Sequence, residues 1–267
     1  MHFAGYCLSV FIGFSLALVG GGGSILTIPV LVFFFNIDPL LATTYSLFIV
    51  GITAVSGSIN HYRIHNVDYK IVFLFGIPSV ILLLIVRRWL LTMLPESLFH
   101  IGSFVLTKSL LILILFTLIM ILAGISMIIK KNYIPKEKQS FSRLIALGCI
   151  TGALTGFMGI GGGFIIVPSL VLFASLPMKR AIGTSLTIIT INCIVGILGN
   201  LDAAVSLNYM FLAAFATFAI AGILSGTWVI RYISDKKLKP VFGWIILGMS
   251  VVIVVRIFLA IEYKDFI

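Results

Sequence analysis

Residues 20–31 read GGGGSILTIPVL, and residues 159–170 read GIGGGFIIVPSL. Each copy joins two apolar segments through a run of glycines, and each then carries a proline, Pro29 or Pro168. Glycine lets the backbone turn sharply, and proline fixes the backbone φ angle. Each copy therefore predicts a helical hairpin with a glycine-rich tip.

The composition around these hairpins is that of a membrane protein. Of the 267 residues, 61% are hydrophobic and 10% are charged, and the mean hydropathy is +1.24. A soluble domain has about 25% charged residues, so this chain lacks the polar surface that a soluble enzyme or a nucleic-acid-binding protein needs. The net charge of +10 is typical of a membrane protein with basic cytoplasmic loops. The three cysteines show no disulfide or metal-binding spacing, and the N-terminus predicts no cleaved signal peptide.

Apolar runs of the length of membrane helices account for most of the chain. They lie at 3–19, 24–36, 39–60, 70–94, 104–130, 143–158, 163–176, 180–200, 207–231 and 240–261. Helices are expected because an isolated strand leaves backbone groups unpaired in lipid. The sequence therefore predicts an all-α polytopic membrane protein. A hydrophilic stretch divides it into a first membrane repeat at 1–130, a cytoplasmic linker at 131–142 and a second membrane repeat at 143–267.

The two halves align without a gap when residues 13–57 are placed on 152–196. The shared residues are mainly glycines, a proline and an Ala-x-x-x-Ser-Leu element, which reads ATTYSL at 42–47 and AIGTSL at 181–186. Each half contains one hairpin and three long helices, and so crosses the membrane an odd number of times. The second repeat is therefore expected to be inverted relative to the first, as in many secondary transporters.

The basic residues predict the orientation of the chain. If the loop near 36–38 lies outside, most of the 18 lysines and arginines fall on the inside. This arrangement agrees with the positive-inside rule and places both termini outside the cell membrane. Arg87 and Arg88 are exceptions, and their long side chains can reach the interface from the outer end of a helix.

The paired glycine motifs, the proline that follows each of them and the Ala-x-x-x-Ser-Leu elements resemble the sulfite exporter TauE/SafE family of membrane permeases. The resemblance covers nearly the whole chain and includes the element from Asn66 to Tyr69. It implies a permease for sulfur-containing anions such as sulfite or organosulfonates. The chain departs from the paired pattern at Tyr45, which aligns with Thr184 of the second copy.

We expect the anion to bind between the two tips. A helix N-terminus has unpaired N–H groups and about half a positive charge, both of which favour an anion. The glycines could instead serve only to pack helices closely, and that is the role we assign to Gly13 and Gly152. Gly22 and Gly162 are expected to face the substrate path near the membrane midplane. The candidate substrate-binding residues are Gly20, Gly21, Gly22, Gly23, Ser24, Thr27, Ser46, Gly161, Gly162, Gly163, Thr184 and Ser185.

Other polar residues within the segments permit more than one interpretation. Hydroxyl groups in apolar helices often bond to their own backbone, and can also line a polar path. His61 is either an interfacial residue or a group that binds an anion or a proton, and Cys193 is expected to be a packing residue. No aspartate or glutamate lies within a predicted span, so a carboxylate proton relay is not supported.

The sequence thus predicts a permease of the cell inner membrane that exports a small anion by alternating access. No catalytic constellation, metal site or cofactor is expected, and so no enzymatic activity. The predicted partners are the anion and the lipid bilayer and do not include nucleic acid. The oligomeric state is left open, a homodimer included. The alternative is an assembly or accessory protein of the membrane, but the chain has no long soluble segment for a partner.

Overall fold

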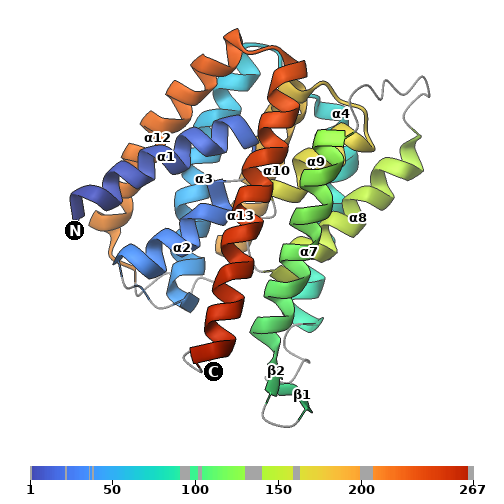
Figure 1. Cartoon of the computed structure of the whole chain (residues 1–267). Helices are drawn as coiled ribbons and strands as arrows, with labels where there is room; N and C mark the ends of the chain where they lie inside the picture. The colour runs from blue at the N-terminus through green and yellow to red at the C-terminus, as the bar shows by residue number, and fades with distance from the viewer. Residues whose placement is uncertain are drawn as a thin grey trace.

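The computed structural model describes residues 2–21, 23–35, 37, 39–90, 97–101, 104–129, 140–158, 163–198 and 207–263. The described chain is mostly helical, and its helices gather into one bundle (Figure 1). The first half contains α1 (His2–Val19), α2 (Gly23–Phe35), α3 (Pro39–Arg63) and α7 (Lys108–Ile129). The second half contains α8 (Phe141–Met158), α9 (Gly163–Leu172), α10 (Met178–Leu198), α12 (Tyr209–Tyr232) and α13 (Asp235–Tyr263).

Between α3 and α7, four helical pieces follow one another without a break. They are α4 (Tyr69–Ile71), η1 (Val72–Gly76), α5 (Ile77–Ile85) and η2 (Val86–Leu90), of which η1 and η2 are wider π-helical turns. The first wide turn lies just before Pro78, whose nitrogen has no hydrogen to donate to the preceding turn. Local widening lets the other backbone groups of an apolar helix keep their hydrogen bonds.

Each predicted apolar segment forms a helix within a few residues of its expected bounds. The all-α class is confirmed, with one local addition that the sequence did not predict: strands β1 (Ser97–Ile101) and β2 (Phe104–Thr107) form an antiparallel pair before α7. The helix expected from residue 104 therefore begins only at Lys108. The hairpin sequence is rich in aromatic and β-branched residues, which fit a pleated strand better than a helix.

Small residues let two pairs of helices approach closely. α1 packs along α12, and α5 packs along α8. A Cβ atom on Gly13 would overlap the backbone carbonyl of Ala219, and one on Gly152 would overlap that of Ser79. The packing role predicted for Gly13 and Gly152 is therefore confirmed, and it fits the small-residue packing of membrane helices.

Helices α3 and α10 pack along each other and connect the two halves. Leu186 and Cys193 of α10 are fully buried and lie against Gly57 and Gly51 of α3. Cys193 is thus a packing residue, as the sequence predicts. This packing places α10, in the middle of the second half of the chain, next to α3 of the first half.

The same two helices are tied to the opposite halves by equivalent hydrogen bonds. The backbone N–H of Asn208, just before α12, donates to the hydroxyl of Tyr45 in α3 at 2.7 Å. The backbone N–H of Asp68, just before α4, donates to the hydroxyl of Thr184 in α10 at 3.0 Å. Asn208 and Asp68 also cap their own helices through their side chains. The Tyr45/Thr184 difference between the two copies therefore changes the residue and keeps the interaction.

Three helices in the described part of the chain are long and apolar enough to cross a membrane. They are Met178–Leu198, Tyr209–Tyr232 and Lys237–Val255. Large apolar side chains point outward from them, and Leu198 and Phe218 are 62% and 44% exposed. Such exposure would be costly in water and is expected against lipid.

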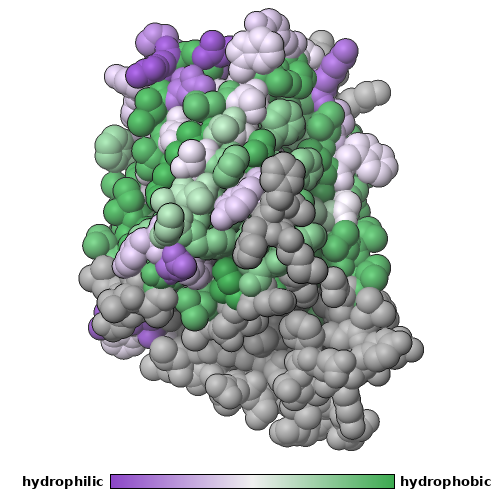
Figure 2. Space-filling view, turned by 90° about the vertical axis from the view of Figure 1, so that its left-hand side faces the viewer, coloured by the Kyte–Doolittle hydropathy of each residue, from purple (hydrophilic) through white to green (hydrophobic). Residues whose placement is uncertain are grey.

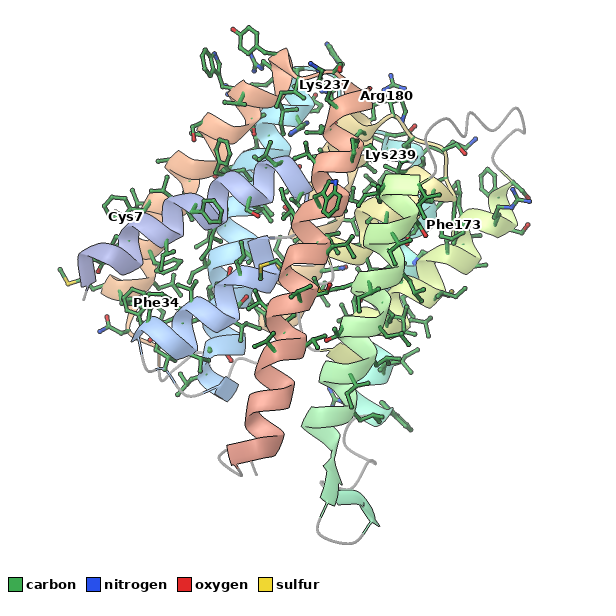
Figure 3. All side chains as sticks on the ribbon, in the orientation of Figure 1. Cys7, Phe34, Phe173, Arg180, Lys237 and Lys239 are labelled. Atoms are coloured by element: carbon green, nitrogen blue, oxygen red, sulfur yellow. The ribbon has the colours of Figure 1, made fainter. Side chains whose placement is uncertain are left out.

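Hydrophilic side chains gather at one end of the molecule, above a broad hydrophobic face (Figure 2). Arg180, Lys237 and Lys239 lie at this end (Figure 3). We call it the basic end, and it contains Lys179, Arg180, Arg231, Lys237 and Lys239, with Lys70 over the ring of Phe141 at the start of α8. The side chain of Lys179 donates to the backbone of Arg231, while its backbone donates to Asp235. These described lysines and arginines are among those that the sequence assigns to the inner side of the membrane, and in the structure they lie at one end of the molecule.

Candidate functional site

The first glycine tip begins where α1 ends. The backbone N–H of Gly20 closes the last turn by donating to Leu16 at 2.8 Å. Gly20 then adopts a left-handed conformation with φ +61°, which favours glycine. A Cβ atom at this position would also lie 2.8 Å from Oγ of Ser185 and from Cγ2 of Val167. Both the backbone and the surroundings of the tip therefore require glycine.

The two tips lie against each other. A Cβ atom on Gly21 would overlap the backbone of Gly163, the first residue of α9, and a Cβ atom on Gly163 would overlap Gly21. Only a pair of glycines allows the two backbones to approach this closely. We call Gly20, Gly21, Gly163 and Ser185 the tip contact.

Ser185 of α10 fixes the first tip. Its hydroxyl lies 2.6 Å from the carbonyl oxygen of Gly20 and 2.8 Å from that of Ile182, and the residue is fully buried. Its single hydroxyl hydrogen is directed to backbone carbonyls. Ser185 therefore positions the tip and does not present a free donor to an anion in this conformation.

The electrostatics of the tip contact come from the backbone. Helices α2 and α9 begin at the tips and each contributes the partial positive charge of a helix N-terminus, while α1 ends at the first tip and contributes the partial negative charge of a C-terminus. The sequence has no Lys, Arg, Asp or Glu at 3–37, 39–60, 144–178 or 181–201. The surrounding helices thus contain no ionised carboxylate that would oppose an anion.

The tip contact lies about halfway along α10. That helix has 21 residues, which at 1.5 Å per residue gives about 30 Å, the thickness of the hydrocarbon core. Ser185 lies beside Gly20, and Ile189, one turn further, lies beside Gly163. A bound ion at this level would be near the middle of the candidate span.

The other predicted site residues are placed less directly. Thr184 is fully buried and accepts the Asp68 hydrogen bond that ties α4 to α10. Thr27 on α2 and Ser46 on α3 are buried. Gly23 and Ser24 form the first turn of α2. Three predicted residues lie outside the described part of the chain: Gly22, Gly161 and Gly162.

Two buried polar side chains near this region have no hydrogen-bond partner among the described residues. Asn192 of α10 is 2% exposed, and both atoms of its amide are unpaired. His61 of α3 is fully buried with both ring nitrogens unpaired, and lies against Gly183 at the basic-end side of the tip contact. Sequence reasoning did not place Asn192 in the site, although its spacing of seven residues from Ser185 puts both on one face of the helix.

Comparison with known proteins adds to this geometry. The family model described as sulfite exporter TauE/SafE matches residues 6–253. A protein of Xylella fastidiosa, named probable membrane transporter protein, is 30% identical over 256 residues, which are 92% of each chain. A similarly named protein of Methanocaldococcus jannaschii is 29% identical over 82% of this chain and 80% of its own. Another from Bacillus subtilis is 26% identical over 83% of this chain and 86% of its own. No solved structure matches the chain significantly.

Proposed function

Because the chain belongs to the sulfite exporter TauE/SafE family, a family of membrane transporters, we propose that it carries a small sulfur-containing anion across the membrane. The substrate would be of the sulfite or organosulfonate class. The observation that carries this proposal is the tip contact. There, the N-terminus of α9 lies against Gly21, two residues before α2 begins, among helices without ionised side chains.

The proposed binding site lies between the tips, with the glycines and hydroxyl residues named from the sequence. Backbone N–H groups at the starts of α2 and α9 would donate to the anion. Thr27, Ser46 and Ser185 would provide the polar surroundings of the site. Because glycine has no side chain, an oxyanion can approach the backbone donors directly.

Alternating access is the proposed mechanism, with two inverted repeats at 1–130 and 143–267 and a cytoplasmic linker at 131–142. The support is twofold. The α1–α12 pair matches the α8–α5 pair in the way it packs, and the Tyr45–Asn208 bond matches the Thr184–Asp68 bond. In each case a helix of one half contacts a helix of the other half. Rocking of one half against the other would expose the tip contact to each side in turn.

Export is the proposed direction, from the basic end toward the opposite side of the cell inner membrane. With the basic end in the cytoplasm, both termini lie outside. An inside-negative potential favours outward movement of an anion by about 2.3 kcal/mol per elementary charge per 100 mV. The proposal needs no catalytic step and no cofactor.

The test is flux through the purified protein in proteoliposomes. We expect uptake of labelled sulfite and ethanesulfonate to exceed that of ethylammonium, a cation of similar size, and to respond to an imposed potential. Comparable flux of ethanesulfonate and ethylammonium would refute an anion site. Absence of any flux would favour the alternative of an assembly or accessory protein.

A further inference from the structure

Asn192 is an unusual residue in the middle of α10. Its side chain is 98% buried, as follows from its 2% exposure, and neither its amide nitrogen nor its amide oxygen has a partner among the described residues. Nearby hydroxyl groups on the same helix satisfy themselves, since Thr190 donates to the carbonyl of Leu186. An amide cannot bond back to its own helix so readily, and burying it unpaired costs free energy. A ligand with matching groups would recover that cost.

Asn192 lies on α10 beyond the tip contact. Seven residues are nearly two full helical turns, so Asn192 lies on the same face of α10 as Ser185, about 10 Å further along. Ile189, between them, contacts Gly163 at the start of α9. Cys193 contacts α3 through Gly51, on a neighbouring face. Asn192 thus lies on the α10 face that carries Ser185, less than one turn beyond Ile189, which contacts the start of α9.

We propose that Asn192 binds the transported anion, and that this anion is singly charged and also carries a hydrogen-bond donor. This inference rests on the proposed function and narrows its substrate class. Protonated oxyanions and sulfonates with a hydroxyl group belong to this class. Sulfate does not belong to it, and simple alkyl sulfonates, which lack the donor, are slower substrates.

The hydrogen-bonding groups of the Asn192 amide explain why the anion should carry a hydrogen-bond donor. The amide nitrogen of Asn192 can donate to an oxyanion, and the amide oxygen can only accept. An anion without a donor would leave that oxygen unpaired and facing negative charge. An anion that carries an O–H or N–H group satisfies both amide atoms.

The electrostatic surroundings of the site favour an anion with a single negative charge. The helices at the tips have no lysine or arginine over 3–37, 39–60, 144–178 and 181–201. The N-termini of α2 and α9 provide about half a positive charge each, and the C-terminus of α1, which also ends at the tips, offsets part of it. A second negative charge would remain uncompensated in an apolar surrounding, where the cost of burying charge is large.

The experiment compares ethanesulfonate with 2-hydroxyethanesulfonate, two monoanions that differ by one hydroxyl group. Flux of both and of labelled sulfite is measured with wild-type protein, N192L and T53V. Thr53 is the repeat counterpart of Asn192, and its buried hydroxyl already donates to the carbonyl of Ile49. Wild type and T53V should transport the hydroxylated anion about tenfold faster, as expected for one hydrogen bond to a buried polar group. N192L should transport the two sulfonates equally.

A second measurement separates binding from a structural role. Leucine has a similar size to asparagine and no unpaired amide, so N192L should melt at a higher temperature than wild type without substrate. It should also lose stabilisation by 2-hydroxyethanesulfonate. A lower melting temperature in N192L would overturn the inference, because it would assign the amide a structural role.

The flux outcomes distinguish this inference from the proposed function. Equal flux of the two sulfonates in wild type, including no flux of either, would overturn the inference, as would an unchanged preference in N192L. Absence of flux for sulfite and for both sulfonates would overturn the proposed function itself.

Discussion

Gly21 and Gly163 touch through their backbones, although the repeat alignment does not pair them. The alignment places Gly21 opposite Ile160 and Gly163 opposite Ser24. At the scale of the residue, the tip contact therefore depends on two glycines with different positions in their motifs. The sequence identifies the glycine runs, and the contact identifies which members cannot be replaced.

Alanine at Gly163 tests this contact. The added Cβ would overlap Gly21, so G163A should lower the free energy of unfolding by about 1–3 kcal/mol, as overpacking does. Transport should fall further than the fraction of folded protein falls, because the tips move apart. The measurements are melting temperature and sulfite flux on the same preparation.

The matched control is Gly248 of α13, which has no atom within 4 Å of an added Cβ. G248A should leave flux unchanged and should not lower the melting temperature, since alanine favours a helix over glycine. If G163A behaved like G248A, the tip contact would not matter for stability or transport.

At the scale of the element, hydrogen bonds between the halves set where helices α4 and α12 begin. Tyr45 and Thr184 each accept a backbone N–H from the residue that caps one of these helices. Tyr45 lies on α3 and Thr184 on α10, two helices that pack along each other. The two halves are thus coupled by a matched pair of bonds in addition to apolar packing.

Y45F and T184V remove one of these acceptors each. Each variant should lose about 1 kcal/mol of stability, because a part-buried backbone N–H loses its partner. The double variant should lose about the sum, since the two bonds share no atoms. Thermal unfolding in detergent measures the effect. Y62F is the control, because Tyr62 is 58% exposed and its hydroxyl is in no such bond. A Y45F melting temperature equal to that of Y62F would contradict the assigned role.

At the scale of the whole molecule, charge separates one end from the rest. At the basic end, the C-termini of α3 and α12 lie close to the N-termini of α4, α8, α10 and α13. Arg231, for example, donates to the side chain of Asn60 at 3.2 Å. An asymmetric distribution of basic residues is the feature that orients membrane proteins.

Single cysteines at positions 2, 136 and 266 test the orientation in a protein without Cys7, Cys149 and Cys193. With an impermeant maleimide on intact cells, we expect labelling at 2 and 266, and labelling at 136 only after the membrane is permeabilised. Labelling at 136 in intact cells, without labelling at the termini, would show the reverse orientation.

The sequence by itself determined the helical class, the positions of the helices and the packing roles of Gly13 and Gly152. These features depend on hydropathy and on small residues, which are local properties of the chain. The hairpin at 97–107 was not predicted, because its residues are apolar enough to extend the neighbouring helix and only strand pairing distinguishes them.

The tertiary structure alone decided which groups meet. Ser185 is directed to the Gly20 carbonyl, Thr184 to the start of α4, and the amide of Asn192 to no described partner. All three residues are polar and lie on α10, and the sequence shows no difference in their surroundings. The predicted site included Ser185 and Thr184 but not Asn192. Their roles differ because each faces a different neighbour, and neighbours distant in sequence are brought together only by the packing of α10 against the first half of the chain.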